Sequence, residues 1–197
     1  MRRKTFDLIV TALGAGLTVV LLAAGALGLW GYNYANTNVH NQLAMQQITF
    51  PAAGSSALAS PKIGPYLNKY AGQQLLTGQQ AEAYADHFIA VHLSEMPFGG
   101  VYSKASAAAQ ADPKNTTLAT EVNTIFKGTT LRGLLLEAYA FWTIGQVALV
   151  GSIVAFVLAG LMLILTALGV WHFRRTDEDA EFPNLHSSEE KRVPAGV

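Results

Sequence analysis

The sequence predicts an all-α membrane protein with two transmembrane helices and a helical extracytoplasmic domain between them. Two uncharged stretches, 8–30 and 138–171, are each long enough to cross a hydrocarbon core of roughly 30 Å, which needs about 20 apolar residues in a helix. The segment between them has the composition of a soluble domain. Over the whole chain, 51% of the residues are hydrophobic and only 13% are charged, which is typical of a protein that is part span and part domain.

Basic residues next to the two stretches predict the orientation, because Lys and Arg are retained on the cytoplasmic side. Arg2, Arg3 and Lys4 precede the first stretch, whereas Arg174 and Arg175 follow the second. We therefore expect both termini in the cytoplasm and the middle of the chain outside the plasma membrane. The expected segments are a cytoplasmic N-terminus at 1–7, transmembrane helix 1 at 8–30, an extracytoplasmic helical domain at 31–137, transmembrane helix 2 at 138–172 with its outer turns above the bilayer, and a disordered cytoplasmic tail at 173–197.

A cleaved signal peptide is the alternative for the first stretch, because basic residues, an apolar run and Ala24-Gly25-Ala26 fit its outline. The apolar run continues past this tripeptide to Trp30, which favours a retained anchor. The tail is assigned as disordered because it is rich in charge and poor in apolar residues, so it buries too little surface to offset its ordering entropy.

Small residues recur four apart in both stretches and predict faces for helix contact. Such rows let two backbones approach closely, which is what associates helices in lipid. The alternative is that Ala and Gly are simply common in membrane helices. The residues of these rows are Ala12, Gly16, Ala24 and Gly28 in the first stretch, and Ala148, Gly151, Ser152, Ala155 and Ala159 in the second.

The clearest helix of the middle segment begins after Thr77, which forms a capping box with Gln80 and is followed by apolar residues at helical spacing up to Met96. Further helices are predicted at 34–48 as an extension of the first span, at 66–76 after Pro65, and near 118–126 with an end at Gly128, while 51–65 is predicted to be a loop. Apolar residues just before and at the start of the second span form a helical stripe that we expect to face the domain: Leu131, Leu134, Leu135, Ala138 and Trp142.

No motif indicates chemistry. Cysteine is absent, glycine-rich phosphate loops are missing, and the spans hold no ionisable residue of the kind that a proton relay needs. His92 and Glu95, three apart on the predicted helix, are the candidates for a metal site with His40 as a third ligand. The alternative is a hydrogen bond between His92 and Glu95, so we expect no metal and no cofactor. Lys and Arg equal Asp and Glu at 13 each, so no nucleic-acid partner is expected.

The runs AEAYADHFIAVHL at 81–93 and TLRGLLLEAY at 130–139, which leads into Phe141 and Trp142, resemble a group of small two-span actinobacterial membrane proteins of unassigned role. Some members of this group carry the label aromatic ring-opening dioxygenase. The resemblance covers the middle segment and both spans, and it implies the two-span topology and a place in the bacterial envelope. Ring opening by non-haem iron needs a preformed site with open coordination positions, and His40, His87 and His92 lack a fitting spacing, so it implies no activity for this chain.

Three hypotheses follow. The first is a non-enzymatic plasma-membrane protein that lies in a lipid bilayer and acts as an accessory or assembly subunit, binding another integral membrane protein or a second copy of itself. The second is an extracytoplasmic sensor or small-ligand-binding module with an apolar pocket lined by Tyr84, Phe88 and His92. The third is a metal-dependent enzyme at His92 and Glu95.

Overall fold

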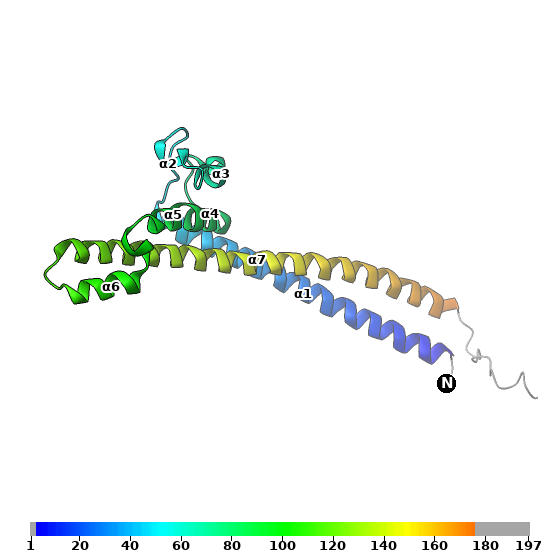
Figure 1. The fold of residues 1–197 in the computed structure, drawn as a ribbon. Coiled ribbons are helices and arrows are strands. Elements are labelled where there is room, and N and C mark those ends of the chain that lie inside the picture. Colours follow the sequence, from blue (N-terminus) through cyan, green and yellow to red (C-terminus); the bar gives the residue numbers. More distant parts are fainter. Residues whose placement is uncertain (1–2, 176–197) are drawn as a thin grey trace, which may run out of the picture. The chain divides into compact units, whose positions relative to one another are not determined.

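A computed structural model of the chain describes residues 3–175, and this part of the chain is mostly helical and contains no strand (Figure 1). Two helices, of 44 and 60 residues, are long and apolar enough to cross a membrane. The elements are α1 (Arg3–Gln46), α2 (Ser56–Ala59), α3 (Gly64–Leu67), the 3-10 helix η1 (Asn68–Tyr70), α4 (Gly78–Tyr84), the π-helical turn η2 (Ala85–Ile89), α5 (Ala90–Ser94), the 3-10 turn η3 (Pro97–Gly100), α6 (Tyr102–Ala111) and α7 (Thr116–Arg175).

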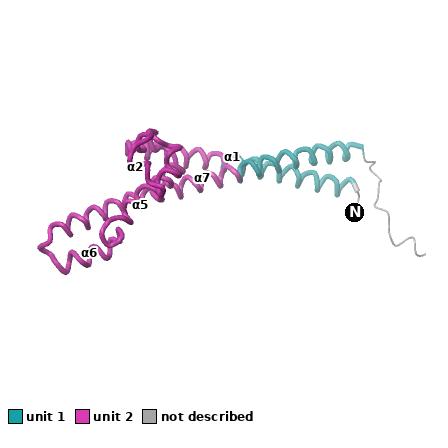
Figure 2. The backbone as a smooth tube through the Cα atoms, turned by 45° about the horizontal axis from the view of Figure 1, so that its top comes forward, with its two compact units in different colours: residues 1–28, 151–197 teal, residues 29–150 magenta. Residues whose placement is uncertain are grey.

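The chain divides into two compact units (Figure 2). Within the described residues, unit 1 comprises 3–28 and 151–175, and unit 2 comprises 29–150. Both α1 and α7 contribute to each unit.

Unit 1 is an antiparallel pair of helix segments in close contact. A Cβ added at Gly14 would lie 2.8 Å from Thr166 Oγ1, and one added at Gly169 would lie 2.8 Å from Thr11 Oγ1. The buried and half-buried positions follow steps of three and four, which is the heptad spacing of two helices that wrap around each other. This seam consists of Asp7, Thr11, Gly14, Thr18, Leu21, Gly25 and Gly28 on α1, and Ser152, Ala155, Ala159, Met162, Thr166, Gly169 and Phe173 on α7.

Unit 2 has an ordinary hydrophobic core. Val39 and Leu43 of α1 and Leu135 of α7 pack with Ala81, Ala85 and Ile89 of the α4–η2 segment, so that segment lies against both long helices. Residues of the connection between α1 and α4 complete the core: Phe50, Leu58, Ile63, Leu67 and Leu75. The Phe50 ring lies 5.4 Å from that of Tyr84, centroid to centroid.

The predicted helix after Thr77 is confirmed, including its capping box. Thr77 Oγ1 accepts a hydrogen bond from the Gln80 amide at 3.2 Å, and Gln80 Oε1 accepts from the Thr77 amide at 3.1 Å. The helical run continues through η2 to Ser94. Its π-helical turn was not predicted.

Two predicted helix ends are wrong. Gly128 does not stop a helix, because α7 runs through it from Thr116. Its missing side chain instead makes room for Leu93, whose Cδ2 would lie 2.8 Å from an added Cβ. The helix predicted at 66–76 ends at Tyr70, since Gly72 has a φ of 71° and the Gly72 and Leu75 amides donate to the carbonyls of Pro51 and Ile48.

The other predicted elements are partly correct. The first span extends as a helix to Gln46, where Gln47 takes a left-handed φ of 52°. The predicted loop at 51–65 contains the short helix α2. In the stripe predicted to face the domain, Leu135 is buried and Leu131, Ala138 and Trp142 pack on the core, but Leu134 is 58% exposed.

Candidate functional site

The surface of unit 1 is inverted relative to that of a soluble protein. Its seam holds small and hydroxyl-bearing residues: Ser152 Oγ donates to the Gly25 carbonyl at 2.7 Å, and Thr18 Oγ1 donates to the Gly14 carbonyl at 2.8 Å. Its outer faces carry large apolar side chains instead. Those more than half exposed include Leu8, Leu13, Val19, Val20, Leu27, Ile153, Leu161, Leu163, Ile164 and Leu168.

The residues predicted as helix contacts divide into two groups. Gly28, Ala148, Ser152, Ala155 and Ala159 are buried or half-buried, and Ser152 and Ala159 are among the most buried positions of α7. Ala12, Gly16, Ala24 and Gly151 are exposed, and a Cβ added at Gly16 or Gly151 would meet no atom within 4 Å. The second group therefore takes no part in the contact between α1 and α7.

The exposed Gly16 lies on the face of α1 that points away from α7. It sits midway between the seam residues Gly14 and Thr18, and two residues of an α-helix turn through about 200°. Ala12 lies one turn before it, and Leu13 and Val20 flank it on the exposed face. This arrangement leaves a notch in an otherwise bulky apolar surface.

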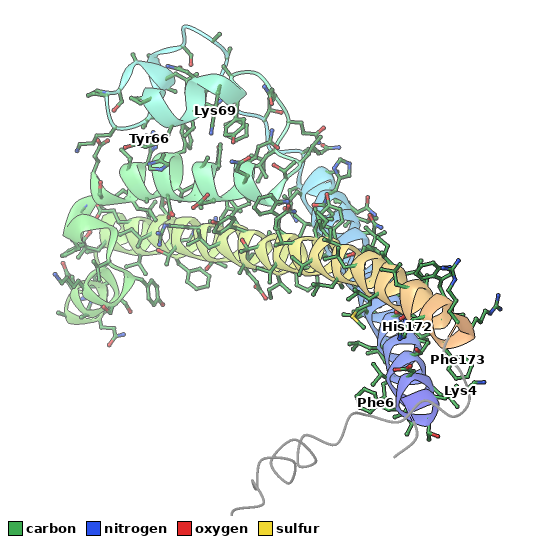
Figure 3. The ribbon with its side chains drawn as sticks, turned by 90° about the vertical axis from the view of Figure 1, so that its right-hand side faces the viewer. Lys4, Phe6, Tyr66, Lys69, His172 and Phe173 are labelled. Atoms are coloured by element: carbon green, nitrogen blue, oxygen red, sulfur yellow. The ribbon has the colours of Figure 1, made fainter. Side chains whose placement is uncertain are left out.

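Charged side chains gather at one end of unit 1 (Figure 3). Lys4 Nζ lies 5.6 Å from the Phe173 ring centroid, and His172 Nε2 lies 3.8 Å from Asp7 Oδ2. The Arg175 guanidinium lies 4.2 Å from the Trp171 ring centroid. Unit 1 thus has a polar end, where α1 begins and α7 ends.

The candidate metal ligands His92 and Glu95 do not form a site. The His92 ring donates from Nδ1 to the Phe88 carbonyl at 2.7 Å, rather than bonding to Glu95. His40 lies on α1, in a polar groove of about 370 Å³ with Asn36 and Thr77 among its lining residues. Within residues 3–175, no three His, Cys, Asp or Glu side chains lie close enough together to hold a metal ion.

The residues predicted to line a ligand pocket instead pack in a row with their rings tilted against one another. The Phe88 ring lies 4.8 Å from that of Tyr84 and 4.4 Å from that of His92, centroid to centroid. Burial raises the pKa of the Tyr84 hydroxyl above its ordinary value, because the charged phenolate would lose water. These three residues line neither of the two grooves described here.

An ion pair that the sequence did not predict joins the π-helical turn to α7. Arg132 Nη2 donates to Asp86 Oδ1 at 2.6 Å, and both side chains are more than a third exposed. Next to Asp86, the His87 ring stacks flat on that of Tyr66 with 3.6 Å between centroids. The sequence separation of 46 residues between Arg132 and Asp86 hides this contact from any local pattern.

A larger groove of about 520 Å³ lies in unit 2, where α1 and α7 diverge. Its floor is apolar, and one rim carries the amides of Asn38, Gln42 and Gln46, spaced one turn apart on α1. That spacing was the one sequence signal for the groove. The remaining lining residues are Tyr34, Val39, Leu43, Leu131, Leu134, Leu135, Glu137, Ala138 and Phe141.

Comparison with known proteins adds no assignment: no family model matches the chain, and neither curated proteins nor solved structures gave a significant match.

Proposed function

We propose that the chain crosses a lipid bilayer twice, with 31–137 outside the plasma membrane and both termini in the cytoplasm, and that it is a non-enzymatic accessory subunit that binds another membrane protein. The observation that carries this proposal is the inverted polarity of unit 1. In water, its outer faces would form an exposed apolar surface far larger than monomeric soluble proteins tolerate. In lipid the same surface is fully solvated, and helices associate through small residues and hydrogen bonds between helices. Gly14 and Ser152 make such contacts here, since Gly14 lies close to Thr166 and the Ser152 hydroxyl donates across the seam to the Gly25 carbonyl.

The orientation is supported by the polar end of unit 1. Lys4 and Arg175 lie at this end, each next to an aromatic ring. Aromatic side chains are enriched at both surfaces of a bilayer, whereas Lys and Arg are in excess on the cytoplasmic side, so the basic residues favour the cytoplasm for this end.

The notch at Gly16 supports a partner helix. Glycine destabilises a helix interior by about 0.5–1 kcal/mol relative to alanine, and no side chain within residues 3–175 uses the space at Gly16. A second helix that packs over Ala12 and Gly16 would gain close backbone contact there, since such four-residue spacing of small residues is a common contact motif in membranes.

Site-specific crosslinking tests the proposal in membranes of cells that naturally make the protein. A photoreactive residue at Leu13, beside the notch, is expected to give a crosslinked product with a second membrane protein, and Gly16→Leu is expected to abolish it. Gly160→Leu is the matched control, because Gly160 is also exposed and without neighbours but lies on α7. A crosslinked product at twice the mass of the chain would show that the partner is a second copy of this protein. Absence of any product from Leu13 would overturn the proposed binding role.

The topology has its own test, which uses the absence of cysteine from the sequence. Single cysteines are introduced by Ser106→Cys in unit 2 and by Ser188→Cys near the C-terminus. A membrane-impermeant maleimide added to intact cells is expected to label the first variant only. Labelling of the second in intact cells would contradict the orientation.

The π-helical turn and the aromatic stack do not favour an enzyme, because their side chains are engaged in pairs and stacks. A ligand-binding role would lie at the groove between α1 and α7 and not, as the sequence predicted, at Tyr84, Phe88 and His92.

A further inference from the structure

We infer that the groove between α1 and α7 in unit 2 holds one acyl chain of a membrane lipid, which enters from the outer surface of the bilayer. The inference rests on the proposed membrane placement of the chain. It assigns a binding site and a ligand class to a part of the molecule that the proposed partner contact does not use.

The shape of the groove fits a single hydrocarbon chain. Its volume of about 520 Å³ lies within the range of roughly 300–1,000 Å³ that is usual for small-molecule sites. From Leu131 to Phe141 it follows α7 for about 15 Å at the helical rise of 1.5 Å per residue.

The groove is continuous with apolar surface on the same unit. Tyr34 and Phe141 form one end of it, with ring centroids 6.5 Å apart, and Trp30 stacks on Tyr34 at 5.6 Å. Ile144 and Val147 follow Phe141 along α7 and are more than 60% exposed. Tyr and Trp favour the membrane interface, so this end of the groove is where the lipid surface would meet it.

The apolar floor and wall of the groove favour entry of the acyl chain. Val39, Leu43 and Leu135 are buried beneath it, while Leu134 on its wall is 58% exposed. An acyl chain gains little by leaving other chains, but it removes water from this wall, and removal of apolar surface from water is favourable.

The charge of the groove selects the part of the lipid that it accepts. Among the residues that the structure describes, Glu137 is the one acidic or basic side chain that lines the groove, so none of them offers a cation to a phosphate. The amides of Asn38, Gln42 and Gln46 offer neutral donors and acceptors along the rim. The groove is therefore suited to a hydrocarbon chain, with the headgroup left outside.

Photolabelling in vesicles tests this inference on the full chain. The protein is reconstituted in phosphatidylcholine vesicles doped with a phosphatidylcholine that carries a diazirine on one acyl chain, irradiated, digested and mapped by mass spectrometry. We expect adducts on Ile164, which marks the bilayer core, and also on Leu134 and Leu131 in the groove. Leu134→Trp, which fills the groove, is expected to lower labelling of Leu131 at least fivefold. The control Ala140→Trp adds the same bulk to an exposed position of α7 that does not line the groove, and it should leave the labelling of Leu131 unchanged.

The possible outcomes separate this inference from the proposed function. Labelling of Ile164 without labelling of Leu131 and Leu134 would leave the membrane placement intact and overturn the groove assignment. Crosslinks from groove residues to a second copy would also overturn it. Absence of labelling at Ile164 as well would refute the membrane placement itself.

Discussion

Replacing Gly78 by alanine should destabilise unit 2, although alanine is the better helix former. Gly78 is the first residue of α4 and is buried against α7. A Cβ added there would lie 2.5 Å from Trp142 Cγ and closer still to Trp142 Cβ. Because Trp142 Cβ is fixed to the backbone of α7, a change of rotamer cannot relieve the overlap, and α4 and α7 must move apart.

Two opposing effects set the magnitude. Removing glycine from a helix gains about 0.5–1 kcal/mol, whereas overpacking a core costs about 1–3 kcal/mol. With backbone-linked atoms in contact, the cost lies at the upper end, so we expect a net loss of about 1–2 kcal/mol in the free energy of unfolding. For a unit of this size, that loss lowers the melting temperature by roughly 4–12 °C.

Thermal unfolding of the full chain in detergent micelles, followed by tryptophan fluorescence, measures this change. Gly133→Ala is the matched control, because Gly133 is also helical, on α7, and has no atom within 4 Å of an added Cβ. It should stabilise the protein by about 0.5–1 kcal/mol. If Gly78→Ala were as stable as wild type or more stable, the close approach of α4 to α7 would be refuted.

Three further predictions concern the α4–η2 segment. Thr77→Ala should cost about 1 kcal/mol and speed amide exchange at Gln80, while Thr77→Ser should keep the cap. Asp86→Asn should lower the free energy of unfolding by no more than about 1 kcal/mol, because the ion pair with Arg132 is partly exposed. In denaturant titrations, added salt should reduce the difference from wild type. A larger loss that does not depend on salt would contradict this prediction. Burial raises the pKa of Tyr84 above its ordinary value of 10.0, so the folded state holds the phenol proton more tightly than the unfolded state. The resulting contribution to the free energy of unfolding is complete below pH 10 and is lost as the pH rises toward the folded-state pKa. Tyr84→Phe carries no phenol proton, so its free energy of unfolding should fall less than that of wild type at alkaline pH. Identical pH profiles of the two proteins would show that the pKa of Tyr84 does not change on folding.

Local patterns predicted the elements whose causes are local. The capping box at Thr77 fixed one helix start, and the length of the uncharged runs identified the two long helices. Glycine was misinterpreted where its role depends on a distant partner. The sequence predicts a helix stop at Gly128, whereas in the structure this glycine accommodates Leu93 from another part of the chain.

The seam of unit 1 shows a similar limit. Spacing of four residues between small residues selected Ala12 and Gly16, but the contact with α7 uses Gly14 and Thr18. Both rows satisfy the same local rule, and only the position of the partner helix distinguishes them. A heptad pattern that counts threonine as a small residue would have found the second row. The groove escaped prediction because it depends on where α1 and α7 diverge, which no periodicity encodes.

The two long helices change the kind of residue that they bury partway along their length. On α1 the buried positions change from Thr18, Gly25 and Ala35 to Val39 and Leu43. On α7 they change in the opposite chain direction, from Leu135 to Gly145, Ser152 and Ala159. Large apolar side chains make a core when water is the surrounding solvent, whereas small and hydroxyl-bearing ones do so when lipid is.

The change falls at the aromatic residues. Trp30 and Tyr34 come just before the change on α1, and Phe141 and Trp142 lie between Leu135 and Gly145 on α7. Trp and Tyr favour the boundary between lipid and water, so buried residue size and aromatic placement change in the same stretch of both helices. A soluble helical hairpin has no reason to change both there. The proposed bilayer surface accounts for both changes, and it would place one end of the α1–α7 groove at the lipid.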